Sequence, residues 1–94
     1  MIFDAGTTNI PAAGTATQLN NTERKVRVIE VRSRPSNVGN IYFGVSDVSK
    51  TNGRTLQPEE TVTVNFGDGS EPFSNFYVDA DTSGDNADWS VIIR

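Results

Sequence analysis

Apolar residues recur at every second position in four short segments of this chain, and this pattern constrains the fold more than any other feature. The sets are Ile41, Phe43 and Val45; Val62, Val64 and Phe66; Phe76, Val78 and Ala80; and Trp89, Val91 and Ile93. A repeat of two is typical of an extended strand with one buried face. No stretch of ten or more residues has apolar residues at helical spacing without an interruption by Gly, Pro or Asn. We therefore expect an all-β chain whose strands share one core, with Thr61, Thr63, Asn65, Asp79 and Ser90 facing outward.

One segment breaks the alternation. In KVRVIEVRSR (residues 25–34), Val26 and Val28 share one parity, whereas Ile29 and Val31 share the other. Either a bulge near Val28 shifts the register, or both faces of the strand are partly covered; we favour the bulge. Pro35 then ends the strand, because it has no amide to donate.

The spacing of strands and turns predicts a single small domain. Segments rich in Gly, Asn, Asp, Ser and Pro separate the strands, and 94 residues are enough for one compact core. The expected fold is a small β-sandwich or jelly-roll-like domain over residues 15–94. Residues 1–14 have only scattered apolar side chains and are expected to form an irregular N-terminal arm. Its apolar residues Ile2, Phe3 and Ile10 either pack on their own domain or reach a neighbouring subunit.

The residue types present argue against an enzyme. The chain has no histidine and no cysteine. This excludes Ser-His-Asp and Cys-His catalysis, imidazole acid–base chemistry, His- or Cys-ligated zinc, and disulfides. The carboxylates lie in polar, turn-rich stretches, where they are expected to be ionised and solvated. We expect no catalytic residue, no cofactor and no metal that the fold requires.

The acidic segment DADTSGDNADWS (residues 79–90) begins like a calcium-binding loop. Its twelfth position holds Ser90 where an EF-hand requires a bidentate glutamate, and no helices flank it. Two alternatives stay open for these aspartates: a looser calcium site in a β-loop, or a turn in which the carboxylates cap backbone amides.

Charge and hydropathy limit the partners. The formal net charge is -4, and Glu23 and Glu30 interrupt the alternating basic residues Lys25, Arg27, Arg32 and Arg34. A solvated strand face explains this pattern better than a nucleic-acid site. No apolar run is long enough to cross a bilayer, and the first residues do not resemble a signal peptide. We expect a protein that is made in a cytoplasm and binds neither nucleic acid nor membrane.

The aromatic residues suggest an alternative binding function. Tyr42, Tyr77 and Trp89 could supply a stacking platform for sugars on the surface of a sandwich. Trp89 shares its parity with Val91 and Ile93, which favours a place in the core for this side chain. A module that binds glycans is therefore one functional hypothesis for this chain, and it is the alternative to the function considered next.

Three stretches of the chain resemble a known group of proteins. They are GTATQL near the start, VRVIEVRSRPSNVGNIYFGVSDVSKTNGRTLQPEETVTV in the middle, and FYVDADTSGDNADWSVI near the end. Their order is similar to that of small virion proteins encoded among the head and tail genes of tailed bacteriophages. In that pattern a glycine often follows the proline of the middle loop, whereas this chain has Pro58-Glu59.

The resemblance implies a structural part of a phage particle, and most directly a decoration (cement) protein. Such proteins bind the outer surface of the capsid, often as trimers, and bridge neighbouring copies of the major capsid protein. The resemblance implies no active site. It makes the exposed loop from Ser46 to Thr55 a second candidate contact beside the N-terminal arm. The candidate subunit or capsid contacts are Ile2, Phe3, Ile10, Asn52 and Arg54.

Overall fold

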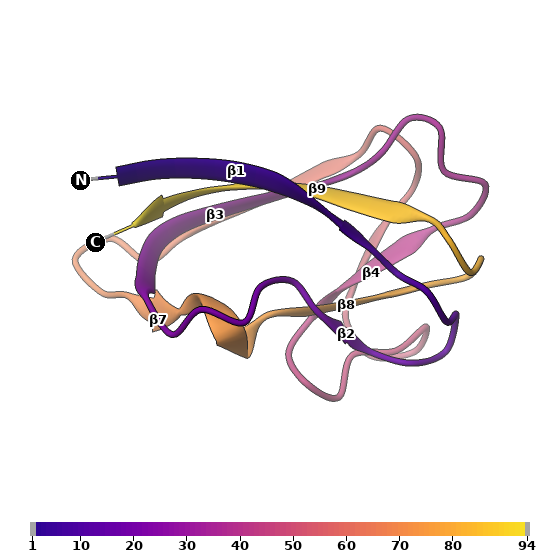
Figure 1. Ribbon diagram of the computed structural model, residues 1–94, viewed down its shortest axis with the longest axis horizontal. Helices are drawn as coiled ribbons and strands as arrows, with labels where there is room; N and C mark the ends of the chain where they lie inside the picture. Colours follow the sequence, from indigo (N-terminus) through magenta and orange to yellow (C-terminus); the bar gives the residue numbers. More distant parts are fainter. Residues whose placement is uncertain (1, 94) are drawn as a thin grey trace.

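The computed structural model describes residues 2–93 and is a β-sandwich, which confirms the expected fold class (Figure 1). The strands are β1 (Ile2–Asn9), β2 (Thr17–Gln18), β3 (Lys25–Ser33), β4 (Ile41–Gly44), β5 (Arg54–Leu56), β6 (Thr61–Asn65), β7 (Glu71–Pro72), β8 (Tyr77–Ala80) and β9 (Asn86–Ile93). A single 3-10 turn, η1 (Phe73–Asn75), lies between β7 and β8. Within residues 2–93 there is no helix with the length and hydropathy needed to cross a membrane.

Two antiparallel sheets form the two layers. The larger sheet has the order β1-β9-β3-β6, and β7 pairs with the start of β3; the smaller sheet has the order β2-β8-β4-β5. Figure 1 shows β1, β9 and β3 side by side in one layer, with β2, β4 and β8 in the other. The first and last strands of the chain therefore lie next to each other, and β9 is a central strand of its sheet.

The core lies between the sheets and uses most of the predicted residues. Ile41, Phe43, Val78, Val91 and Ile93 are all buried. The edge strand β6 places Val62, Val64 and Phe66 against the core in partly buried positions. The ring centroids of Phe43 and Phe76 are 5.8 Å apart in a stacked arrangement, and those of Phe73 and Trp89 are 4.9 Å apart edge to face.

Two predicted positions of the alternation are wrong. Val45 is 53% exposed, because β4 ends at Gly44 and the chain turns before the alternation reaches this residue. Asp79 was expected to face outward, but it is 2% exposed. Its carboxylate accepts hydrogen bonds from the amides of Gly14 (2.9 Å) and Ala80 (2.8 Å), which satisfies a charge in this buried position.

The predicted bulge in β3 is confirmed. The register between β3 and β9 shifts between Val26 and Val28. Val26 and Ile29 are both buried although their parities differ, and Val28 lies on the other side of the sheet from Ile29. The bulge thus puts the apolar residues on both sides of it into one core and leaves Val28 on the outer face.

The expectation of an irregular N-terminal arm is wrong for residues 2–9. All eight of these residues pair with β9, so β1 belongs to the larger sheet and the predicted boundary at residue 14 does not separate an arm from the domain. The inner face of β1 has no apolar alternation because it accommodates the indole of Trp89. A Cβ on Gly6 would lie 2.6 Å from that ring, and the indole N–H donates to the Thr8 hydroxyl (3.1 Å).

The turn at Pro58-Glu59 shows how this chain accommodates glutamate where the resembled sequences often have glycine. The amide of Glu60 donates to the carbonyl of Gln57 (2.9 Å), and Glu59 has a φ of 79°. A proline followed by a residue with positive φ is the arrangement of a type II turn. Glu59 therefore adopts the conformation that glycine would take there.

Candidate interaction face of the larger sheet

The outer face of the larger sheet is built from the residues that alternate with the core residues. Strand pairing aligns them in rows that cross the sheet from β1 through β9 to β3. The row nearest the start of β1 contains Phe3, Ile92 and Val28, and the second contains Ala5, Ser90 and Glu30. The third row contains Thr7, Asp88 and Arg32. An apolar row, formed by Phe3, Ile92 and Val28, therefore lies two rows away from a charged row.

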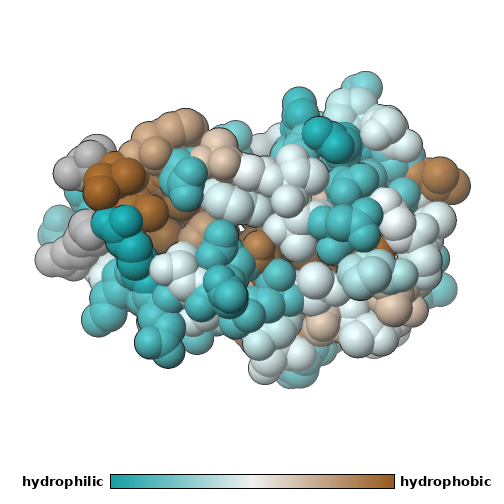
Figure 2. Space-filling model, in the orientation of Figure 1, coloured by the Kyte–Doolittle hydropathy of each residue, from teal (hydrophilic) through white to brown (hydrophobic). Residues whose placement is uncertain are grey.

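The apolar row is unusual for a face that no other layer covers. Phe3 is 70% exposed, and Ile92 and Val28 are partly exposed. Ile2 is 48% exposed, but it lies opposite Ile93 and so belongs to the other face of β1. Figure 2 shows apolar surface gathered at the end of the molecule where β1 begins and β9 ends. Single exposed apolar side chains are common, whereas apolar side chains grouped on one face favour a surface that binds a partner.

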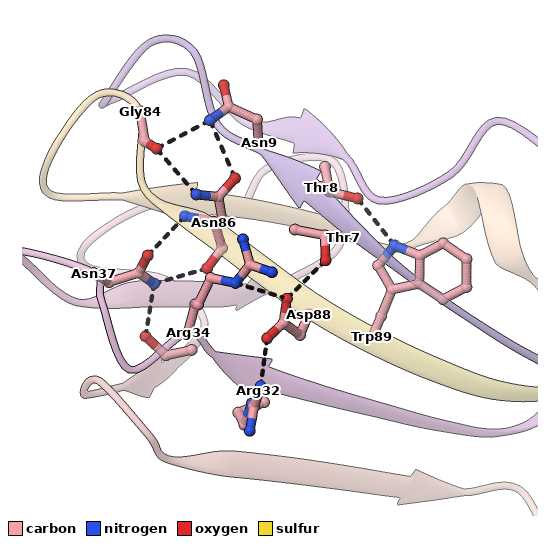
Figure 3. Close-up of polar contacts among 11 residues, drawn as sticks. Thr7, Thr8, Asn9, Arg32, Arg34, Asn37, Gly84, Asn86, Asp88 and Trp89 are labelled. Carbon is pink, nitrogen blue, oxygen red and sulfur yellow. Dashed lines mark hydrogen bonds and ion pairs between the residues drawn. The ribbon is translucent and has the colours of Figure 1, made fainter.

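The charged row is centred on Asp88 (Figure 3). Arg32 Nη2 donates to Asp88 Oδ2 at 2.7 Å, the Thr7 hydroxyl donates to Oδ1 at 2.8 Å, and Arg34 Nε lies 3.4 Å from Oδ1. Burial alone would raise the pKa of Asp88, but the hydrogen bonds from Arg32 and Thr7 and the charge of Arg34 outweigh it, so the pKa lies below its usual value. We define the charged row as Thr7, Asp88, Arg32 and Arg34.

Asparagines fix the end of β9 that carries the charged row. The Asn37 side chain donates to the carbonyl of Asn86 (2.7 Å) and accepts from its amide (2.8 Å), so it pairs with this residue as a neighbouring strand would. Its side chain also donates to the hydroxyl of buried Ser33 (3.0 Å). Arg34 follows the end of β3, and its amide donates to the same Asn86 carbonyl (3.3 Å). These bonds hold Arg34 beside Asp88.

The free edge of β1 borders the face and is partly protected against strand addition. Ile10 donates to the carbonyl of Asp85 (2.9 Å) and accepts from the amide of Gly84 (2.8 Å), so even-numbered residues direct their backbone groups toward β9. Alternation directs those of odd-numbered residues toward the free edge. The Ala5 amide is one of them, and it donates to the Asp4 carboxylate (2.9 Å). A charged side chain on an edge is a common device against edge-to-edge pairing, so the face is better suited than the edge to binding a partner.

The structure divides the five predicted contact residues into three groups. Ile2 and Phe3 are exposed at the start of β1, as a contact requires. Ile10 is fully buried in the core, so its prediction as a surface contact is wrong; its backbone and side chain complete the β1 end of the sandwich. Asn52 and Arg54 are exposed, but they lie on the β4–β5 loop and the edge of the smaller sheet. The structure does not bring them together with Ile2 and Phe3.

Aspartates of the acidic segment cap backbone amides. Asp85 accepts from the amides of Val38 (3.1 Å) and Gly39 (2.9 Å), in addition to the bonds of Asp79 described above. Among residues 2–93, no group of three or more acidic side chains could hold a metal ion. The geometry favours the capping alternative for this segment over the calcium site.

Two of the three aromatic residues considered for sugar stacking are unsuitable. Trp89 fills the core, and Tyr42 is 5% exposed with its hydroxyl donating to Asp81 (2.8 Å). Burial raises the pKa of Tyr42, and the hydrogen bond to Asp81 raises it further. Tyr77 differs, because it lines an open hollow at one end of the sandwich. The other residues that line this end hollow are Val45, Ser46, Phe66, Glu71, Ser74, Asn75 and Phe76.

Sequence reasoning missed Val28, Ile92 and the charged row. The inward parity of Val91 and Ile93 already indicates that Ile92 faces outward, and the bulge indicates the same for Val28. What aligned these residues with Phe3 is the pairing of β1 with β9, which the sequence pattern did not predict.

Comparison with known proteins shows a similar fold in one solved structure and gives no information on function. No family model matches the chain, and no curated protein matches it. Among solved structures, the chain is similar to part of IMPa from Pseudomonas aeruginosa, which was solved in complex with an O-glycopeptide. The TM-score is 0.58 at 12% sequence identity, over 98% of this chain. The chain spans about 12% of the length of that protein, and likeness at this identity shows a shared fold only.

Proposed function

We propose that this chain is a structural virion protein that decorates the outer surface of a tailed-phage capsid and bridges neighbouring copies of the major capsid protein. The observation that carries the proposal is the exposed apolar row of Phe3, Ile92 and Val28 on the outer face of a rigid sheet. The resemblance of the three sequence stretches to small virion proteins supplies the kind of particle. The partner surface is the major capsid protein, and the chain acts as a homotrimer.

Three features support a docking role. The face is built on paired strands, so a partner meets a surface that loses little conformational freedom on binding. Exposed apolar area at its edge supplies the favourable part of the contact. In a trimer, three such faces would act together, and avidity would compensate for the small area of each contact.

Co-sedimentation with expanded capsids of the encoding phage tests the proposal. We expect the wild-type chain to pellet with the capsids, and Phe3→Ser to weaken binding by about tenfold or more, because it removes the most exposed apolar side chain of the row. Val38→Ser is the matched control, since Val38 is 81% exposed but lies in the loop between β3 and β4. A wild-type chain that stays in the supernatant would overturn the proposal. If the purified chain sediments as a monomer in analytical ultracentrifugation, the homotrimer part of the proposal is wrong.

A second function has one observation in its favour, the end hollow beside Tyr77. It has a volume of about 660 Å³, within the range of small-ligand pockets. Tyr77 lines it together with Glu71 and Asn75, a combination of an aromatic ring, a carboxylate and an amide that suits a sugar. This alternative is a tail- or neck-associated module that recognises host glycans.

Retention on columns of host polysaccharide tests this alternative. We expect Tyr77→Ala to abolish retention. Tyr42→Phe should leave retention unchanged, because Tyr42 is buried and pairs with Asp79, away from the residues that line the end hollow. Equal retention of the wild type and Tyr77→Ala would exclude the end hollow as the glycan site.

A further inference from the structure

We infer that the outer face of the larger sheet recognises an acidic side chain of its protein partner through Arg32 and Arg34, in register with an apolar side chain that packs on the apolar row. This inference rests on the proposed docking function and names the chemistry of the partner surface.

The first observation is that two guanidinium groups share one carboxylate. Within residues 2–93, the acidic partner of both Arg32 and Arg34 is Asp88. The side chains of the two arginines are 48% and 44% exposed, whereas that of Asp88 is only 18% exposed. Each guanidinium has five N–H donors in a planar fork, so most of the donors on this part of the face are left for a partner.

The second observation is that Asp88 orients the arginines. The 2.7 Å bond from Arg32 and the 3.4 Å contact from Arg34 bring both guanidiniums to the same carboxylate (Figure 3). All three residues line one open hollow on the face, together with Ala5, Gly6, Thr7, Glu30, Trp89 and Ser90. Preorganised arginine forks bind carboxylates by two parallel hydrogen bonds, which gives directional recognition as well as charge attraction.

The distribution of charge guides an acidic group to this position. The chain as a whole has a net charge of -4, so most of its surface is expected to repel an acidic partner. Glu30 lies in the row between the apolar row and the charged row, and its carboxylate accepts from the Thr63 hydroxyl on β6 (3.3 Å). A partner carboxylate placed one row too close to the apolar row would meet Glu30, and this repulsion sets the register.

The third observation is the spacing of the two rows. Phe3 and Thr7 on β1, like Ile92 and Asp88 on β9, are separated by four positions of an extended strand. At about 3.3 Å per residue this is about 13 Å. The matching partner segment is extended, with an apolar residue and an acidic residue four positions apart on the same side.

A defined peptide tests the inference without a capsid. The probe is a synthetic, acetylated and amidated pentapeptide of leucine, threonine, serine, threonine and glutamate, added to the ¹⁵N-labelled full chain. We expect saturable NMR shifts of the Nε–H signals of Arg32 and Arg34 and of the Phe3 amide at about millimolar peptide. The same peptide with glutamine in place of glutamate should shift the arginine signals at least fivefold less at equal concentration. The absence of arginine shifts at about 10 mM peptide would overturn the inference.

Two double variants distinguish charge from fork geometry. Both variants lack the arginine Nε–H signals, so the Phe3 amide is the common readout: R32Q/R34Q should abolish its peptide shift, and R32K/R34K should retain part of it, since lysine keeps the charge but not the planar fork. R32K/R34K also covers the case in which the glutamine variant does not fold, which far-UV circular dichroism reports. A shift of the Phe3 amide in R32K/R34K as large as in the wild type would contradict recognition by the guanidinium forks.

The capsid experiment separates this inference from the proposed function. If the wild type binds capsids, R32Q/R34Q should bind at least fivefold more weakly at about 0.1 M NaCl, and the difference should shrink at about 0.5 M NaCl because salt screens the charge contact. Equal binding by R32Q/R34Q, with the same salt dependence, would reject the inference and leave the docking function standing. If the wild type fails to bind capsids but the peptide shifts appear, the capsid-docking function is rejected and the recognition of an acidic side chain by Arg32 and Arg34 stands.

Discussion

The two faces of the β1-β9-β3-β6 sheet use the same strands for opposite purposes. On β9, Trp89, Val91 and Ile93 point into the core, whereas Asp88, Ser90 and Ile92 point outward. The inner face gains its stability from close packing and is intolerant of changes in volume. The outer face has an apolar row and a charged row, and among residues 2–93 neither sheet packs on them. One strand can thus hold the fold together with its odd-numbered residues and contribute its even-numbered ones to the proposed recognition surface.

The test with the largest expected effect on stability compares Trp89→Ala on the inner face with Ile92→Ala on the outer face. We expect Trp89→Ala to lower the free energy of unfolding by about 3–5 kcal/mol, because it removes a buried ring packed on Phe73 and its hydrogen bond to Thr8. Ile92→Ala should cost about 1 kcal/mol or less, as for a side chain outside the core. Urea denaturation measures both. Similar losses for the two variants would show that the outer row belongs to the core.

The next test concerns the contact between β1 and Trp89. Gly6→Ala places a methyl group 2.6 Å from the indole, so we expect a loss of about 1–3 kcal/mol from overpacking. Ala5→Ser, one position away on the outer face, should change stability by no more than about 0.5 kcal/mol. Thermal unfolding together with tryptophan fluorescence reports both changes. An unaltered Gly6→Ala protein would mean that β1 does not pack against Trp89.

A smaller effect is expected on the outer face, and it depends on pH. The pKa of Asp88 is lowered in the folded chain, so its contribution to stability is present above the unfolded-state pKa of about 3.9 and is lost as the pH falls through the folded value. Asp88→Asn should therefore destabilise by about 1 kcal/mol at pH 7, as for a partly exposed ion pair. The difference from the wild type should shrink below about pH 4. Denaturation curves across pH measure it, and a constant difference at all pH values would argue against the ionised pair.

The smallest expected change in stability concerns the Pro58-Glu59 turn, which lies on neither face of the larger sheet. Glu59 has a φ of 79°, a conformation that costs a side-chain-bearing residue about 1 kcal/mol. Glu59→Gly should relieve this strain and raise the melting temperature slightly, with a gain of no more than about 1 kcal/mol because glycine has more freedom in the unfolded chain. Glu60→Gly serves as a control and should destabilise, since the Glu60 carboxylate accepts from the Gln57 amide (2.7 Å).

The sequence pattern predicted the fold class and most of the core for a physical reason. Alternating burial is a local property, so the sets ending in Ala80 and Ile93 could be read without knowing the pairing of strands. The bulge near Val28 was predictable for the same reason, because it appears as a break in the alternation. The burial of Asp79 was not predictable, because it depends on the distant Gly14 amide.

The candidate site was less predictable, because it depends on which strands are neighbours. Phe3 was singled out for its apolar side chain, but the role of residues 2–9 as a strand was missed. Gly6 and Thr8 replace the apolar alternation there, and they make sense only beside Trp89, which lies at the other end of the sequence. The meeting of Arg32 with Asp88 likewise depends on the pairing of β3 with β9.

The bulge in β3 also determines which deletions this sequence can tolerate. Arg27 is the extra residue of the bulge, so a chain without it would keep Val26 opposite Ile93 and Val28 opposite Ile92 in regular alternation, with Val26 still facing the core. Deleting a residue beyond the bulge, such as Glu30, would instead place Ile29 and Val31 on opposite faces of the sheet and would damage the interior and the proposed recognition surface together. Substitutions on the outer face would alter the proposed recognition alone. Insertions and deletions should consequently be tolerated best in the turns, whereas point changes at Phe3, Val28, Arg32 and Ile92 are the ones expected to alter the proposed recognition.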